Sequence, residues 1–191
     1  MSSLFSTIVA AALVNNIAFV HLLGLSSLFS YSRRFDAATE IALLSAAVMF
    51  PSLVVCAALD RFVLVPLDIQ FLDLLVFATV SAAIASTLLQ LVASHLPLLA
   101  RKHQLAVAML SCNSAIIGAA FLSVGSLRPF PLQIAYSFGT TIGFSLSLLA
   151  FAAIRQRCAM AAVPAAMKGP AIDLISAGIA AMCFLGFSGL I

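Results

Sequence analysis

Apolar runs of membrane-spanning length, separated by short polar stretches, follow one another along the sequence. Six of them have the roughly 20 mostly apolar residues that a helix needs to cross a bilayer. They cover residues 4–25, 41–59, 71–93, 105–127, 131–153 and 171–191. Too few residues remain between them for a soluble domain. The pattern therefore predicts an all-α fold, with six transmembrane helices in one integral membrane domain over residues 1–191.

The first and fourth runs are interrupted near their middle by polar residues. Asn15 and Asn16 interrupt the first, and Cys112, Asn113 and Ser114 interrupt the fourth. Asparagine disfavours helix interiors because its side chain competes for backbone hydrogen bonds. Polar groups in hydrocarbon cost several kcal/mol unless protein surrounds them. We therefore expect the first and fourth helices to be broken near the membrane midplane, and we expect function at these breaks.

The two breaks occupy matching places in two halves of the chain. Residues 1–96 and 103–191 each contain three spans, and each half begins with an interrupted span. Three crossings reverse the direction of a chain, so the second half would lie upside down relative to the first. Broken helices that meet at the midplane of such inverted repeats form binding sites in transporters. The pattern predicts two inverted three-helix repeats, although two unrelated kinks would give the same interruptions.

The composition and the distribution of charge agree with a membrane protein. Hydrophobic residues make up 64% of the chain and charged residues 8%, which excludes an ordinary soluble domain. Lys and Arg near span ends favour the cytoplasmic side. They follow the first, third and fifth spans at Arg33, Arg34, Arg101, Lys102, Arg155, Arg157 and Lys168, against Arg61 and Arg128 on the other side. We therefore expect both termini outside, and no basic surface is left for nucleic acid.

Other polar residues have simpler interpretations. Asp60 and Asp68 predict a short connection after the second span, and Asp73 predicts a helix cap or an interfacial group. Small residues throughout 137–147 in the fifth span predict close helix packing. The cysteines are too scattered for a zinc site or a Cys-x-x-Cys motif, since they stand singly at Cys56, Cys112, Cys158 and Cys183.

A set of short motifs lies in a fixed order along the chain. It includes Val14-Asn15-Asn16, Gly24-Leu25, Asn113-x-Ala115-x-x-Gly118, Arg155-Gln156-Arg157, Ile175-Ser176-Ala177-Gly178 and Gly186-Phe187-Ser188-Gly189-Leu190. With this order and spacing, the chain resembles one family over essentially its whole length. That family is the A subunit of the Rnf complex, together with the related E subunit of the Na+-translocating NADH:quinone reductase.

The resemblance implies a six-helix subunit of the bacterial inner membrane that pairs with a homologous subunit of opposite orientation. It places this pair in a multi-subunit ferredoxin:NAD+ oxidoreductase that also has flavin-bearing and Fe-S-bearing subunits. Such a complex couples electron transfer across the membrane to Na+ or H+ translocation. The subunit contacts membrane lipid and is not catalytic alone.

The resemblance also implies a [2Fe-2S] cluster at the boundary between the two partners, held by two cysteines from each. One cysteine belongs to a Gly-Leu-Cys-Pro element and the other to an Asn-Cys-Ala element. Matched onto this chain, the elements imply a cofactor site with Ser26 and Ser114 at the ligand positions. The residues around them are Asn15, Asn16, Gly24, Leu25, Asn113 and Gly118.

This chain departs from the family pattern at the ligand positions themselves. Ser26 and Ser114 stand where the family has cysteine, and Ser27 stands where it has proline. A serine oxygen is a hard donor and a poor substitute for thiolate. Cys112 lies two residues before Ser114, and in extended backbone their side chains would share one face, so Cys112 is a candidate replacement ligand. The alternative function is a redox-inactive, transporter-like or scaffold subunit of the same architecture.

Overall fold

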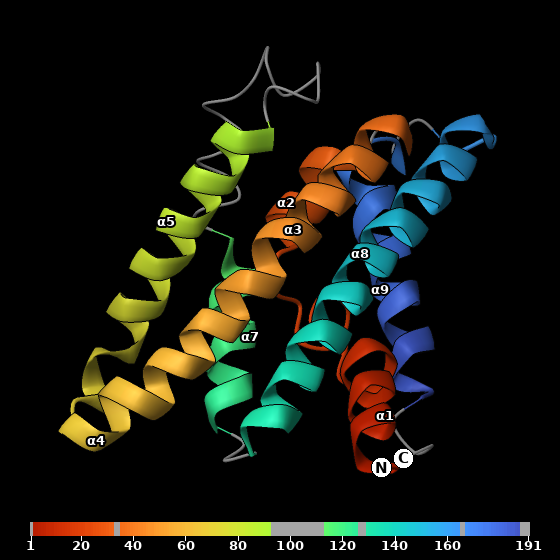
Figure 1. Cartoon of the computed structure of the whole chain (residues 1–191). Helices are drawn as coiled ribbons and strands as arrows, with labels where there is room; N and C mark the ends of the chain where they lie inside the picture. The colour runs from red at the N-terminus through yellow and green to blue at the C-terminus, as the bar shows by residue number, and fades with distance from the viewer. Residues whose placement is uncertain (1, 33–34, 93–112, 126–128, 165–166, 188–191) are drawn as a thin grey trace.

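The computed structural model describes residues 2–32, 35–92, 113–125, 129–164 and 167–187, and these segments contain helices and no strand (Figure 1). The fold class expected from the sequence, an all-helical membrane protein, is confirmed to that extent. In chain order the elements are α1 (Ser2–Val9), the π-helix η1 (Ala10–Val14), α2 (Leu25–Tyr31), α3 (Phe35–Leu59), the π-helix η2 (Asp60–Leu64), α4 (Val65–Leu67), the 3-10 helix η3 (Gln70–Leu72), α5 (Asp73–Val92), α7 (Ser114–Gly125), α8 (Phe130–Met160) and α9 (Pro170–Leu185).

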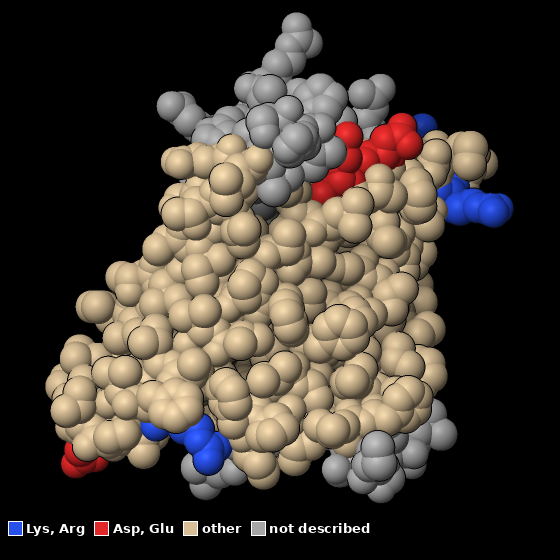
Figure 2. Space-filling model, viewed as in Figure 1, with Lys and Arg blue, Asp and Glu red and all other residues tan. Residues whose placement is uncertain are grey.

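Within the described part of the chain, three helical stretches are long and apolar enough to cross a membrane: Phe35–Leu67, Gln70–Leu88 and Phe130–Met160. The same part also contains shorter apolar helices at Leu4–Val14, Ser114–Gly125 and Pro170–Leu185. On the face seen in Figure 2, charged side chains lie near the two ends of the molecule and uncharged side chains fill the band between. This distribution fits a multi-pass protein whose middle lies in hydrocarbon.

The second span is longer than its apolar pattern predicts. Helical conformation begins at Phe35 and continues past Asp60 to Leu67, so the expected connection at Asp60 is wrong. Neither Asp60 nor the next residue breaks a helix, and Asp60 itself is buried. The chain turns only at Asp68, whose left-handed φ of 55° is one that aspartate tolerates better than most residues. Asp73 stands in the first turn of α5, where the helix dipole favours a carboxylate, as the sequence predicts.

Helices α3 and α8 form an antiparallel pair at the centre of the molecule (Figure 1). Three contacts record the pairing, two from α3 and one from η2, which continues α3. Ser145 Oγ donates to the carbonyl of Ala42 at 3.3 Å. The ring centroids of Phe50 and Phe138, and those of Phe62 and Phe130, are 6.0 Å apart.

Small residues on α8 let the first helical segment approach its backbone, as the small-residue run predicts. A Cβ atom at Gly139 would lie 2.5 Å from the carbonyl oxygen of Ile8, and one at Gly143 would lie 2.6 Å from that of Ala12. Both distances are below van der Waals contact, so neither position has room for a side chain. α1 and η1 are therefore seated directly on the middle of α8.

Gly143→Ala is expected to destabilise the protein by about 1 to 3 kcal/mol, because its methyl group would collide with backbone that cannot rotate away. The measurement is the temperature at which detergent-solubilised protein ceases to elute as a monodisperse species. The matched control is Gly178→Ala in α9, where a Cβ meets nothing within 4 Å. Equal melting temperatures for the two variants would contradict the close seating of η1 on α8.

Candidate functional site

The first break begins where η1 ends. The Asn15 N–H donates to the carbonyl of Ala10 at 2.7 Å and closes the last π-turn. From Asn15 to Gly24 the backbone forms turns, and helix resumes only at Leu25. The expected interruption of the first span is therefore present, and it covers about three helical turns' worth of chain rather than a single kink.

Asn16 is buried at 0% exposure and holds this break through every polar atom of its side chain. Its Nδ2 donates to the carbonyl of Ala12 at 2.9 Å and to that of Gly143 on α8 at 3.1 Å. Its Oδ1 accepts hydrogen bonds from the N–H of Ala18 at 3.0 Å, the N–H of Phe19 at 3.3 Å and Ser147 Oγ at 3.0 Å. The Asn16 carboxamide thus forms hydrogen bonds with backbone groups before and within the break, and it connects this segment to α8 by further hydrogen bonds.

Gly24 ends the break in a conformation that only glycine adopts easily. Its φ is +75°, and a Cβ there would lie 2.8 Å from Ala115 Cβ and 2.9 Å from Cε2 of Phe144. Phe144 is near the middle of α8, so the turn before α2 packs closely between α8 and the start of α7. Leu25 follows as the first residue of α2 and is half-buried.

The second break is described from Asn113 onward; Cys112 and the residues 93–112 before it lie outside the described part of the chain. Asn113 acts as the N-cap of α7, since its Oδ1 accepts the Ala115 N–H at 3.1 Å and its carbonyl accepts the Ile116 N–H at 3.0 Å. The residue is 2% exposed, and none of the described residues provides a hydrogen-bond partner for its Nδ2. Helix α7 thus begins near the middle of the molecule, as expected for an interrupted fourth span.

The structure brings the two breaks together. The N–H of Gly24 donates to Ser114 Oγ at 3.0 Å, across 90 residues of sequence. Leu23 packs so closely on Gly118 that a side chain there would collide with it. The carboxyl ends of α2 and α7 point to opposite ends of the molecule, so the amino ends of the two short helices meet near its middle (Figure 1).

The predicted ligand positions lie at this meeting point but do not fit a four-thiolate cluster. Ser26 and Ser114 are both exposed, and Ser114 Oγ already accepts a hydrogen bond. The described cysteines are placed elsewhere: Cys56 is buried in α3, Cys158 lies near the end of α8 and Cys183 is exposed on α9. Among the described residues, no group of three or more His, Cys, Asp or Glu side chains could hold a metal ion.

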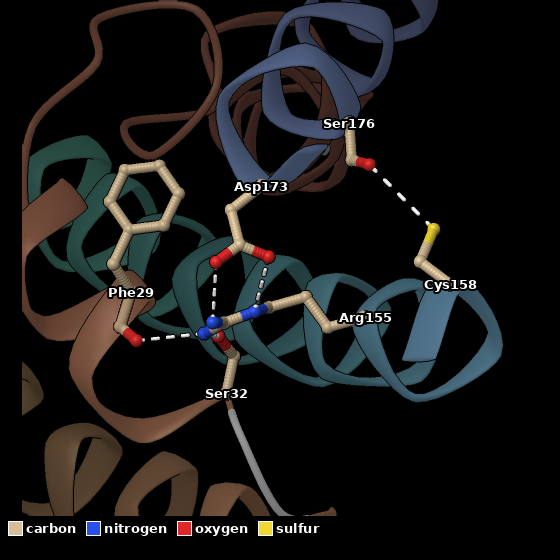
Figure 3. Close-up of polar contacts among 6 residues, drawn as sticks. All are labelled: Phe29, Ser32, Arg155, Cys158, Asp173 and Ser176. Atoms are coloured by element: carbon tan, nitrogen blue, oxygen red, sulfur yellow. Dashed lines mark hydrogen bonds and ion pairs between the residues drawn. The ribbon is translucent and has the colours of Figure 1, made fainter. Parts of the chain in front are cut away.

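Arg155 forms a second polar cluster. From the sequence, this residue was interpreted as a loop charge and as part of a family motif, and the cluster was not predicted. Figure 3 shows its guanidinium facing Asp173 of α9, with Nε–Oδ1 at 2.8 Å and Nη2–Oδ2 at 2.5 Å. Nη1 donates to the carbonyl of Phe29 at 2.8 Å and to Ser32 Oγ at 2.6 Å. Opposite charges at the facing ends of consecutive spans are the signal that could have suggested this pair. The cluster joins α8, α9 and the carboxyl end of α2.

Asp60 and Asp73 interact electrostatically at the end of α3 far from Arg155. Asp60 is 6% exposed, and in the described segments the Oδ1 atom of each carboxylate has no hydrogen-bond partner. Like charges in this arrangement disfavour each other. The pair lies away from the meeting point of α2 and α7, so it is separate from the predicted site.

Asn16→Ala is expected to destabilise the chain by about 2 to 3 kcal/mol, because buried backbone groups would lose their partners. Asn15→Ala is the matched control, since Asn15 is the exposed neighbour. Both variants are compared by thermal unfolding in detergent and by yield in the membrane. A loss confined to Asn15→Ala would refute the role assigned to Asn16.

Arg155→Lys should lower stability by about 1 to 3 kcal/mol although the charge is kept, because an ammonium cannot reproduce the forked contact with Asp173. The exposed Arg157 provides the control variant Arg157→Lys, for which no change is expected. Limited proteolysis of membranes would report loosening of α9. Indistinguishable proteolysis of the two variants would exclude a holding role for the Arg155 cluster.

Comparison with known proteins supports the resemblance drawn from the motifs. A sequence model described as "Rnf-Nqr subunit, membrane protein" matches residues 4–191. A protein of Azotobacter vinelandii is 38% identical over 192 residues, covering 100% of this chain and 99% of the relative. One of Proteus mirabilis is 36% identical over 183 residues, covering 96% and 95%. Both are named as the A subunit of an ion-translocating oxidoreductase complex. The chain therefore belongs to the Rnf-Nqr family of membrane-protein subunits.

Proposed function

We propose that this chain is a membrane subunit of an Rnf-type ferredoxin:NAD+ oxidoreductase, which couples electron transfer across the bacterial inner membrane to translocation of Na+ or H+. The observation that carries the proposal is the full-length similarity to relatives named as the A subunit of an ion-translocating oxidoreductase complex. The chain acts within the complex and is not catalytic alone.

The proposed function includes an inverted-repeat architecture, and the order and direction of the helices support it. Each half of the chain has a short helix that starts at the break, α2 or α7, followed by a long helix, α3 or α8, and then by α5 or α9. The long helices are antiparallel, as the contacts of Phe50 with Phe138 and Phe62 with Phe130 record. Two repeats of opposite orientation would place the amino ends of α2 and α7 at the midplane, where they meet.

The surface at the breaks supports pairing with a homologous subunit of opposite orientation. Asn15, Ser26 and Ser114 are exposed although they lie near the level of the middle of α8. Exposed polar side chains are costly in hydrocarbon, so a protein surface that covers these three residues in the membrane would be favourable. A partner with the same broken helices, turned upside down, would present matching polar ends to this surface.

The charge distribution supports an orientation with both termini in the periplasm. Arg155 and Arg157 stand near the carboxyl end of α8, whereas Arg61 stands near the end of α3 that pairs with the start of α8. The positive-inside rule places the Arg155 end in the cytoplasm. α1 begins and α9 ends at the opposite end of the molecule (Figure 1).

A scaffold or transporter-like subunit without redox chemistry is the second candidate function, and the serines at positions 26 and 114 are the observation that favours it. The two candidates share an architecture but differ in their partners. An oxidoreductase subunit must be found with subunits that carry flavin and Fe-S centres. A scaffold subunit outside such a complex need not co-purify with subunits of that kind.

The test is co-purification from native membranes through an affinity tag on this chain, with flavin fluorescence and mass spectrometry as readouts. We expect flavin-bearing subunits and a homologous membrane subunit to co-purify in equal amounts. Ser26→Phe should abolish recovery of the homologous subunit, whereas Met160→Phe, a control at an exposed position on the last turn of α8, should not. Recovery of this chain alone, or with a transport substrate, would contradict the proposed function.

A further inference from the structure

We propose that this chain closes its mid-membrane break with serine hydrogen bonds and contributes no ligand to an iron–sulfur cluster. The proposal rests on the proposed function, because it concerns what the family's cofactor site has become in this subunit. Ser114, at a cysteine position of the family, and Ser27, at its proline position, then both have a structural role.

Both serines act on the same residue, Gly24. Ser114 Oγ accepts the Gly24 N–H at 3.0 Å, and Ser27 Oγ donates to the Gly24 carbonyl at 2.7 Å. Gly24 is buried and in the left-handed conformation that precedes α2; its carbonyl also accepts the Leu28 N–H at 3.1 Å, whereas Ser114 Oγ is the partner recorded for its N–H. A proline at position 27 would have no hydroxyl to donate, and a cysteine at position 114 would be a weaker acceptor. The two replacements thus place one hydroxyl on the N–H and one on the carbonyl of the same buried glycine.

The buried amide of Asn113 offers the break a donor rather than a ligand. Its Nδ2 has no hydrogen-bond partner among the described residues, and an amide NH2 has no lone pair to give a metal. The Oδ1 atom of Asn113 already accepts the Ala115 N–H at 3.1 Å. Iron–sulfur clusters require soft thiolate donors, and the hydroxyls of Ser26 and Ser114 are hard and weakly acidic. The chemistry at the break therefore favours a hydrogen-bonded closure without iron.

The first test measures iron and acid-labile sulfide, with low-temperature EPR, on the complex purified through a tag on this chain. Ser26→Ala, Ser114→Ala and Cys112→Ala are compared with the wild type. We expect the iron, the sulfide and the [2Fe-2S] signals per complex to be unchanged in all three. Loss of one cluster's iron and sulfide in any of them would overturn the proposal.

The second test separates a hydrogen-bonding serine from its neighbour. Ser114→Ala should lower the apparent melting temperature of the complex by about 2 to 4 °C, since the N–H of the buried Gly24 would lose its hydrogen bond to Ser114 Oγ. Ser26→Ala should leave it unchanged, and Ser114→Thr should restore it because the hydroxyl is kept. Should Ser114→Ala fail to accumulate, accumulation of Ser114→Thr would support the same conclusion.

An unchanged melting temperature in Ser114→Ala would contradict the closure by hydrogen bonds. The same preparations distinguish this failure from failure of the proposed function. Absence of the flavin-bearing subunits would contradict the proposed function. The role of Ser114 could still be decided in that case, because the melting temperature and the iron content can be measured on the tagged chain together with its membrane partner.

Discussion

A chain can leave helical conformation inside a bilayer only if protein groups replace the hydrogen bonds that the helix gives up. In this protein the buried carboxamide of Asn16 meets that requirement, since it bonds two backbone N–H groups within the break and a carbonyl before it. The same side chain reaches Gly143 and Ser147 on α8. The position of the break, and hence of everything that follows up to α2, depends on this one residue.

Helix α2 is held at both ends by interactions of different kinds. At its start, Gly24 is pressed against Phe144 and bonded to Ser114, so its amino end faces α7. At its end, the guanidinium of Arg155 binds the carbonyl of Phe29 while it pairs with Asp173. Arg155 interacts with groups on both α2 and α9, so a movement of either helix would disturb the contacts that hold the other. The fold thus connects the mid-membrane break to the end of the molecule assigned to the cytoplasm.

The breaks could be predicted from sequence because asparagine within an apolar run conflicts with both helix propensity and hydrocarbon. The hydrogen bond between Gly24 and Ser114 could not be predicted from the sequence. The residues next to a serine do not show whether its hydroxyl bonds to a group 90 residues away or faces lipid. The helical path through Asp60 was missed for a related reason: charge suggests a connection, but Asp60 is buried and the chain turns only at Asp68. Arg155 was interpreted as a topology charge and as part of a family motif, and its pairing with Asp173 near the start of the next span was missed.

The central claim is that the two broken segments meet inside the membrane. Leu23 and Gly118 contact each other there, so a chain with Leu23→Cys and Gly118→Cys should form a disulfide in native membranes under mild oxidation. Mass spectrometry of the linked peptides measures it directly, with Leu23→Cys and Gly125→Cys as the control pair. The account predicts linkage of positions 23 and 118 and none of positions 23 and 125. Absence of the first link, or equal formation of both, would contradict it.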